Sequence, residues 1–206
     1  SDVCSSDLEN GANSSFVHQL LDADVPPAAI ATDPIGEALA TGAGPHPKIT
    51  PPPALYGPER ANARGFDHGD PATLEAIAAA RAPFLEPHRW RAVPLVAGAA
   101  GEAGAARPVA NPAAPADVVG EVVEATPERV AQAIDVAEAA RAAWAARPVA
   151  ERAACLARAA DLYEAHAHEF FALCAREAGK TLTDAVAELR EAVDFMRYYA
   201  AGAELA

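Results

Sequence analysis

Only two prolines and two glycines occur in residues 126–206, and their positions constrain the fold more than any other feature of the sequence. Pro127 follows Thr126, a preferred N-cap residue, so this proline begins a helix rather than interrupting one. That helix ends before Pro148, and Gly179 is suited to end the next one because glycine tolerates the left-handed conformation. We therefore expect three long helices, over residues 127–147, about 150–177 and from 182 onward.

Apolar residues recur along each of these segments at the three- and four-residue spacing of one helix face. The faces contain Val130, Ile134, Ala137 and Trp144 in the first helix, Leu156, Tyr163, Phe170 and Cys174 in the second, and Val186, Leu189, Val193 and Met196 in the third. Because each helix has one apolar face, we expect all three to share a core. Aromatic residues make up only 6% of the chain, so that core is thin and the helices should also pack against something outside it.

Short β-strands are predicted before these helices. Residues 93–96, 108–112 and 118–123 are rich in valine and are separated by turn residues. We expect a β-hairpin or meander at the edge of something larger. The glycines at 98, 101 and 104 indicate a turn rather than a phosphate cradle, because no helix begins after them.

Prolines and glycines crowd residues 41–70, which excludes a regular helix or a central strand there. We interpret this segment as an extended connector, followed by a helix that starts at Pro71 after Asp70. Short helices are expected on its N-terminal side, including one that starts at Pro34. The predicted fold is therefore mixed α/β and mostly helical.

The net charge of −13 argues against a nucleic-acid partner for this segment, since phosphates would be repelled. The sequence has no apolar run of the roughly 20 residues needed to cross a bilayer and no secretory leader. We therefore expect a cytoplasmic protein. Residues 1–8 begin without Met and show no periodicity, and we expect them to be a non-native leader.

Two short motifs contain residue types found in phosphate-binding and metal sites, but neither has the required spacing. Gly179, Lys180 and Thr181 form only the tail of a phosphate-binding loop, because the required first glycine is replaced by Cys174. His166 and His168 are two residues apart on a helix and point to different faces, so we expect no metal site. We expect no catalytic residue in this chain.

Glu188 and Glu191 lie three residues apart on the last helix, opposite its apolar face. One interpretation is a solvated face that is partly paired with neighbouring basic residues. The other is that one carboxylate faces a substrate channel. Spacing alone does not decide between them.

Several stretches resemble the aldehyde dehydrogenase superfamily, and within it the bifunctional proline dehydrogenase and glutamate-semialdehyde dehydrogenase family known as proline utilization A. They are residues 120–126 (GEVVEAT), 176–181 (REAGKT) and 194–200 (DFMRYYA). Residues 9–17 (ENGANSSFV) are similar to the end of the proline dehydrogenase barrel, and residues 46–49 (HPKI) to the connector of that family.

The resemblance implies a fragment that spans the junction of two enzymes. Residues 9–40 would be the end of the barrel, 41–70 the connector, and 71–206 the truncated N-terminal part of the aldehyde dehydrogenase domain. An arginine pair that holds the proline carboxylate in the family is replaced here by Ser5 and Ser6. The fragment alone would be inactive.

The resemblance also implies a function for the parent protein. FAD would accept a hydride from proline, and NAD would accept one from the glutamate semialdehyde formed by hydrolysis of 1-pyrroline-5-carboxylate. Glu191 would line the aldehyde tunnel, while Glu9 and Phe16 would lie at the proline and flavin end of the barrel. The expected partners are small-molecule substrates, the remainder of the chain, further copies in a homo-oligomer, and a membrane surface bound peripherally.

Two alternatives remain at this point. The chain could belong to a different NAD-dependent aldehyde dehydrogenase, with a chance match at residues 9–17. It could instead be a non-enzymatic helical module that docks a partner, which would require a self-contained fold without exposed apolar faces.

Overall fold

The computed structural model describes residues 20–40, 42, 49–98 and 104–205, which fall into two compact units divided after Thr50. In the first unit, the described helices are α2 (Pro27–Ile30) and α3 (Pro34–Ala40), so the helix expected at Pro34 is confirmed. Residues 1–8, Glu9 and Phe16 lie outside the described residues. No described helix is long and apolar enough to cross a membrane.

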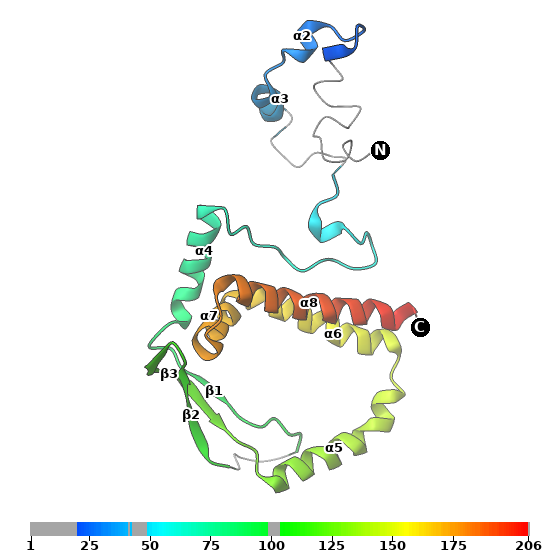
Figure 1. Cartoon of the computed structure of the whole chain (residues 1–206). Helices are drawn as coiled ribbons and strands as arrows, with labels where there is room; N and C mark the ends of the chain where they lie inside the picture. The colour runs from blue at the N-terminus through cyan, green and yellow to red at the C-terminus, as the bar shows by residue number, and fades with distance from the viewer. Residues whose placement is uncertain (1–19, 41, 43–48, 99–103, 206) are drawn as a thin grey trace, which may run out of the picture. The chain divides into compact units, whose positions relative to one another are not determined.

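The second unit carries most of the described structure (Figure 1). Its elements in chain order are η2 (Pro52–Ala54), α4 (Pro71–Arg81), η3 (Ala82–Phe84), β1 (Trp90–Ala92), β2 (Ala106–Asn111), β3 (Ala114–Val123), α5 (Pro127–Ala145), α6 (Val149–Ala165), α7 (Ala167–Ala178) and α8 (Leu182–Leu205). The mixed, mostly helical fold class is confirmed.

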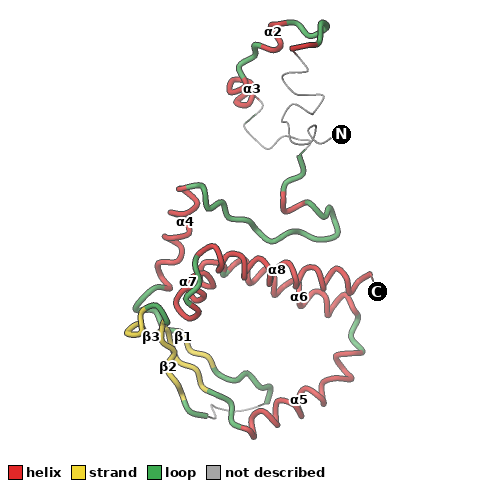
Figure 2. Tube along the Cα trace, viewed as in Figure 1, coloured by secondary structure: helices red, strands yellow, loops and turns green. Residues whose placement is uncertain are grey.

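The three strands form one sheet in the order β1-β3-β2, drawn in yellow in Figure 2. β2 and β3 form the expected antiparallel hairpin, and β1 runs parallel to β3 with Trp90 opposite Gly120. A Cβ added at Gly120 would lie 2.0 Å from the backbone oxygen of Trp90, so only glycine permits this pairing. The strand predicted over residues 93–96 is wrong, because β1 ends before Pro94, which lacks the N–H that a ladder needs.

Helix ends follow the local signals in the sequence. The Asp70 carboxylate accepts hydrogen bonds from the backbone N–H groups of Ala72 and Thr73 and caps α4, and the Thr126 hydroxyl caps α5 by accepting from Arg129 N–H. Gly179 ends α7 at φ 65° and ψ 23°, the left-handed conformation expected of a C-terminal glycine.

The prediction of one continuous helix over about 150–177 is wrong, because the structure has two helices there, α6 and α7. His166 leaves the helical conformation at φ −102° and ψ 18°, and its carbonyl accepts the N–H groups of Glu169 and Phe170 that begin α7. This break turns α7 away from the line of α6 (Figure 1), and Phe171 of α7 then packs edge-to-face on Phe66 at 5.2 Å between ring centroids.

The core lies where α4 and α8 meet α7. Its buried members are Ile77, Ala167, Phe171, Ala185, Val186 and Leu189. Helices α6 and α8 run side by side (Figure 1). A second buried cluster, of Ala63, Ala160 and Val193, lies where the connector meets these two helices. The predicted apolar face of the third helix is therefore confirmed at Val186, Leu189 and Val193.

The expected common core does not include the first long helix. α5 has no buried residue, and Val130, Ile134 and Trp144 on its apolar face are 49%, 64% and 46% exposed. Within the described part of the chain, nothing covers this face. The sequence pattern correctly predicted an amphipathic helix but not the absence of its packing partner.

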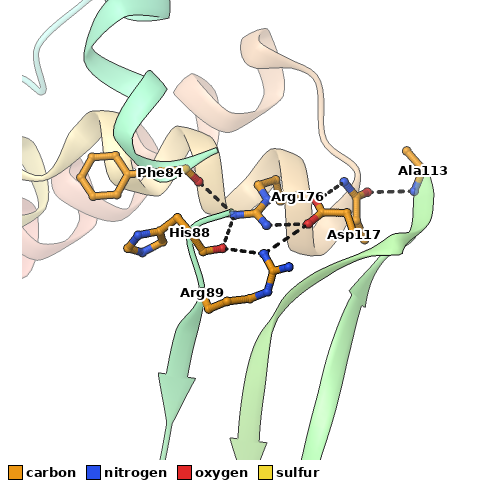
Figure 3. A network of polar contacts seen from close by, with 7 residues as sticks. Phe84, His88, Arg89, Ala113, Asp117 and Arg176 are labelled. Atoms are coloured by element: carbon orange, nitrogen blue, oxygen red, sulfur yellow. Dashed lines mark hydrogen bonds and ion pairs between the residues drawn. The ribbon is translucent and has the colours of Figure 1, made fainter. Parts of the chain in front are cut away.

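A buried ion pair connects the sheet to α7 (Figure 3). Arg176 Nη2 and Nε donate to the two carboxylate oxygens of Asp117 at 2.6 and 3.0 Å, while Nη1 donates to the backbone oxygens of Phe84 and His88 at 3.0 and 2.9 Å. Asn111 also donates to Asp117 at 3.2 Å. All three nitrogens of the Arg176 guanidinium thus donate to an acceptor, as a buried charge requires.

The hydrogen bonds from Arg176 lower the pKa of Asp117 from its ordinary value of 3.8 to about 2, against the opposing effect of burial. Asn111 and the positive charge of Arg89, 3.8 Å away, lower it further. The carboxylate therefore stays charged over the whole neutral and mildly acidic range.

We expect the stability contributed by the Asp117 charge to depend on pH. Because the pKa is lower in the folded state than in the unfolded state, this contribution is complete above about pH 5 and is lost as the pH falls from about 4 towards 2. Urea denaturation of the wild type and of Asp117→Asn should show a difference that is constant near neutrality and shrinks in that acidic range. A difference that stays the same in acid would contradict this assignment.

Phe171→Ala should lower the free energy of unfolding by about 3–5 kcal/mol, because the ring is completely buried and its removal leaves a cavity. Chemical denaturation measures this difference. Leu95→Ala is the matched control, since Leu95 is 93% exposed and should change the stability by less than about 0.5 kcal/mol. Equal losses for the two variants would mean that the core is not centred on Phe171.

Candidate functional site

The candidate site is a groove between the connector and the exposed side of α8. Arg60, Glu191, Asp194, Phe195 and Tyr198 line it, and its volume is about 370 Å³. The four α8 residues stand at positions i, i+3, i+4 and i+7, which places them on one helix face. The opposite face of α8 is held in the core, so the orientation of the groove face is fixed by packing.

Two backbone N–H groups attach the connector to the helices. Ala63 N–H donates to Asp194 Oδ1 at 2.7 Å, and Arg64 N–H donates to Glu164 Oε1 at 2.6 Å. Ala63 itself is buried between α6 and α8. The proline- and glycine-rich connector is therefore irregular, as predicted, and is bound at this point to fixed carboxylates.

Arg197 strengthens the same attachment from α8. Its Nη1 donates to the backbone oxygen of Asn62 at 3.3 Å, and its Nη2 donates to Asp161 and Glu164 at 3.0 and 2.7 Å. The guanidinium thus joins the connector, α6 and α8. These contacts hold the residues just before Asn62, which include the connector side of the groove.

Arg60 is the connector residue that enters the groove. Its guanidinium carbon lies 3.8 Å from the ring centroid of Tyr56 and 5.6 Å from that of Tyr198. Cation–π contacts of this kind hold an arginine in place without neutralising its charge. The sequence interpretation did not single out Arg60, since an arginine in an irregular segment carries no periodic signal.

The structure distinguishes the two glutamates on α8. Glu188 forms an ion pair with Lys180, which raises the pKa of that lysine above its ordinary value of 10.5. Glu191 is exposed in the groove, and its side chain forms no hydrogen bond or ion pair with any described residue. Glu188 therefore belongs to the paired, solvated face, whereas Glu191 lies in the groove.

Lys180 and Gly179 do not form a phosphate-binding loop. Lys180 is paired with Glu188, and Gly179 terminates a helix instead of opening one. Burial raises the pKa of the Cys174 thiol above its ordinary value of 9.0, which disfavours the reactive thiolate. No chemical step is therefore assigned to these side chains.

A three-stranded mixed sheet followed by helices, with a charged groove on the last of them, places the chain among α/β proteins. Residues 99–205 match the aldehyde dehydrogenase family, and this match covers more than half of the chain. The chain therefore belongs to the aldehyde dehydrogenase family.

Known proteins resemble nearly the whole chain. The bifunctional protein PutA of Escherichia coli (strain K12) is 44% identical over 199 residues, which are 94% of this chain and 15% of the relative. A crystal structure of proline utilization A from Bradyrhizobium japonicum matches with a TM-score of 0.63 and 36% identity, over 94% of this chain and 16% of that one. The resemblance to proline utilization A predicted from the sequence is confirmed.

A relative named as a dehydrogenase alone matches less of the chain. The 1-pyrroline-5-carboxylate dehydrogenase 2 of Bacillus subtilis is 44% identical over 90 residues, which are 44% of this chain and 18% of the relative. This chain therefore spans 15 to 18% of the length of these curated relatives.

Asp194→Ala should loosen the connector. The substitution removes the acceptor of the Ala63 N–H, a charge-assisted hydrogen bond worth about 1.5–3 kcal/mol, so exchange of that amide hydrogen should accelerate roughly tenfold or more. Hydrogen exchange followed by NMR measures it. Asp135→Ala removes an exposed carboxylate from α5 and should leave the Ala63 exchange rate unchanged. An unaltered rate in Asp194→Ala would show that Asp194 does not hold the connector.

Proposed function

We propose that this chain is the junction segment of a bifunctional enzyme that converts proline to glutamate. The observation that carries the proposal is the extent of the match: the relative called bifunctional aligns with 94% of the chain, through the connector, whereas the single-function dehydrogenase aligns with 44%. That difference favours the bifunctional parent over another NAD-dependent aldehyde dehydrogenase. The exposed apolar face of α5 counts against a self-contained helical module.

The proposed parent reaction has two oxidations. Proline loses two electrons and two protons to become 1-pyrroline-5-carboxylate, water opens that ring to glutamate semialdehyde, and a second two-electron oxidation with water yields glutamate. FAD and NAD, when bound by the parent, supply the two hydride acceptors. The contribution we propose for the described part of this chain is to shape the path of the aldehyde.

Within that path, Glu191 is the residue we assign to the substrate. Its carboxylate is unpaired among the described residues and faces a groove formed with the connector. Glutamate semialdehyde carries an ammonium group, which a carboxylate can bind by a charge-assisted hydrogen bond. Glu191 would therefore orient the aldehyde by the end of the molecule that does not react.

The remaining features of the parent follow from the same assignment. The rest of the polypeptide would cover the apolar face of α5 and supply the catalytic residues. We place the parent in the cytoplasm as a homo-oligomer that reaches a membrane surface only peripherally. Glu9 and Phe16, outside the described residues, are assigned to the proline and flavin end of the barrel.

Glu191→Ala in the full-length enzyme should raise the KM for glutamate semialdehyde about tenfold, because the substrate ammonium loses its acceptor. Steady-state NADH formation measures this constant, and the rate of proline oxidation should stay as in the wild type. Glu75→Ala, which removes an exposed carboxylate of α4, serves as the matched control. If Glu191→Ala left the KM unchanged, the assignment of Glu191 to the substrate would be wrong.

A further inference from the structure

The connector is seated on α7 by three rings that pack against one another. Phe66 of the connector lies edge-to-face on Phe171, with ring centroids 5.2 Å apart, and edge-to-face on His168 at 6.1 Å. His168 in turn stacks on Phe171 at 5.8 Å, with 23° between the ring planes. We call these three residues the aromatic latch. His168 is the one member of the latch that can acquire a charge.

The side chains of two arginines place positive charge near the His168 ring. The guanidinium carbon of Arg64, in the connector, lies 5.1 Å from the centroid of the Phe66 ring. Arg81 stands in the last turn of α4, and its Nε is buried with no hydrogen-bond partner among the described residues. Burial lowers the pKa of His168 below its ordinary value of 6.5, and the charges of Arg64 and Arg81 lower it further. At neutral pH the ring is therefore uncharged and packs as an apolar group.

The nearest charged groups of α6 and α8 do not offer the ring a partner. Glu164 of α6 accepts the backbone N–H of Arg64 at one carboxylate oxygen and Arg197 Nη2 at the other. Arg190 of α8 lines the narrow crevice that Arg64 and Phe66 also line, so α8 adds a further positive charge on this side.

The other titratable groups beside the latch are also engaged. Glu169, the next residue on α7, accepts the indole N–H of Trp90 at 2.9 Å, and its second oxygen lies 3.4 Å from Nδ1 of His166. His68 of the connector is in contact with α8, because its Nδ1 lies 3.3 Å from the hydroxyl oxygen of Thr183. A proton added to the latch would therefore find no free carboxylate among these groups.

We propose that the aromatic latch is a pH-sensitive switch, in which protonation of His168 separates Phe66 from α7 and loosens the connector at residues 64–68. An imidazolium has two N–H donors, and the phenyl rings of the closed latch offer it no carbonyl or carboxylate acceptor. In the open latch, water solvates the charge. The switch would operate whatever reaction the parent catalyses, since it depends only on how the connector is held.

The pH range of the switch follows from the direction of the pKa shift. Because the pKa of His168 is lower in the closed latch than in the open one, the open latch binds the proton more tightly. The connector is therefore fully seated above about pH 7 and becomes less firmly seated as the pH falls below the ordinary value of 6.5. The Asp117 carboxyl, with a pKa of about 2, keeps its charge over this range, so the buried ion pair with Arg176 stays intact while the latch opens.

Hydrogen exchange followed by mass spectrometry in the full-length enzyme tests the switch. A peptide that covers residues 63–69 is compared at about pH 7.5 and about pH 5.5, after correction for the pH dependence of intrinsic exchange. In the wild type we expect the protection of this peptide to fall about fivefold at the lower pH, because the connector opens locally. Equal protection at the two pH values would overturn the proposal.

His168→Phe removes the titrating group but keeps a ring in the latch. Its protection should therefore agree within about twofold at the two pH values. His166→Phe is the matched control, since this histidine lies two residues away with a side chain that is 60% exposed, and its protection should fall as in the wild type. A fall in His168→Phe as large as that of the wild type would assign the pH dependence to another group and overturn the proposal.

Arg81→Gln gives a second, independent test. Removing a nearby positive charge raises the pKa of His168 in the closed latch, so the fall in protection should shrink from about fivefold to about twofold. Thermal unfolding at neutral pH reports whether each variant is folded. If His168→Phe does not fold, Arg81→Gln decides, and a fall as large as that of the wild type overturns the proposal.

Discussion

The buried pair of Arg176 and Asp117 is the interaction on which the arrangement of the second unit depends. It joins residues that are 59 positions apart, and the same guanidinium holds the backbone oxygen of Phe84, 92 positions away. The hairpin, the turn after α4, and α7 therefore meet at one charged group. Removing either partner would leave a buried charge without compensation, which costs far more than an exposed pair contributes. The position of α7 then sets the position of α8, because both helices bury their apolar faces in the same core.

Features that depend on neighbouring residues were predictable from the sequence. Asp70, Thr126 and Gly179 determine helix ends through hydrogen bonds or backbone conformations that reach only a few residues, so a local pattern is enough. The break at His166 was not predictable in this way, because no glycine or proline marks it and its benefit is tertiary. It allows Phe171 to reach Phe66, a contact across more than a hundred positions that a periodic pattern does not contain.

The groove residues also depend on tertiary contacts that a local sequence pattern does not contain. Glu191 could be proposed as a site residue because its family context is carried by the surrounding residues, whereas Arg60 lies in a segment whose sequence predicts only irregularity. What fixes Arg60 is the attachment of the connector to α6 and α8, through backbone groups that donate to Glu164 and Asp194. Charged side chains on helices thus help to order a segment whose own described helical structure is limited to the short 3-10 helix η2. The sequence of such a segment shows only that it cannot form a regular helix or a central strand. The tertiary structure shows which carboxylates hold it, Asp194 of α8 and Glu164 of α6.

The close approach of β1 to β3 has a consequence for how this sequence can diverge. Gly120 has no space for a side chain because the backbone of Trp90 occupies it, and Trp90 in turn donates its indole N–H to Glu169 of α7 at 2.9 Å. Replacing Gly120 by any other residue would push β1 away from β3 and move Trp90 away from Glu169 of α7. Because backbone atoms of Trp90 fill this space, exchanging a neighbouring side chain does not clear it, and this glycine should persist while the residues around it drift.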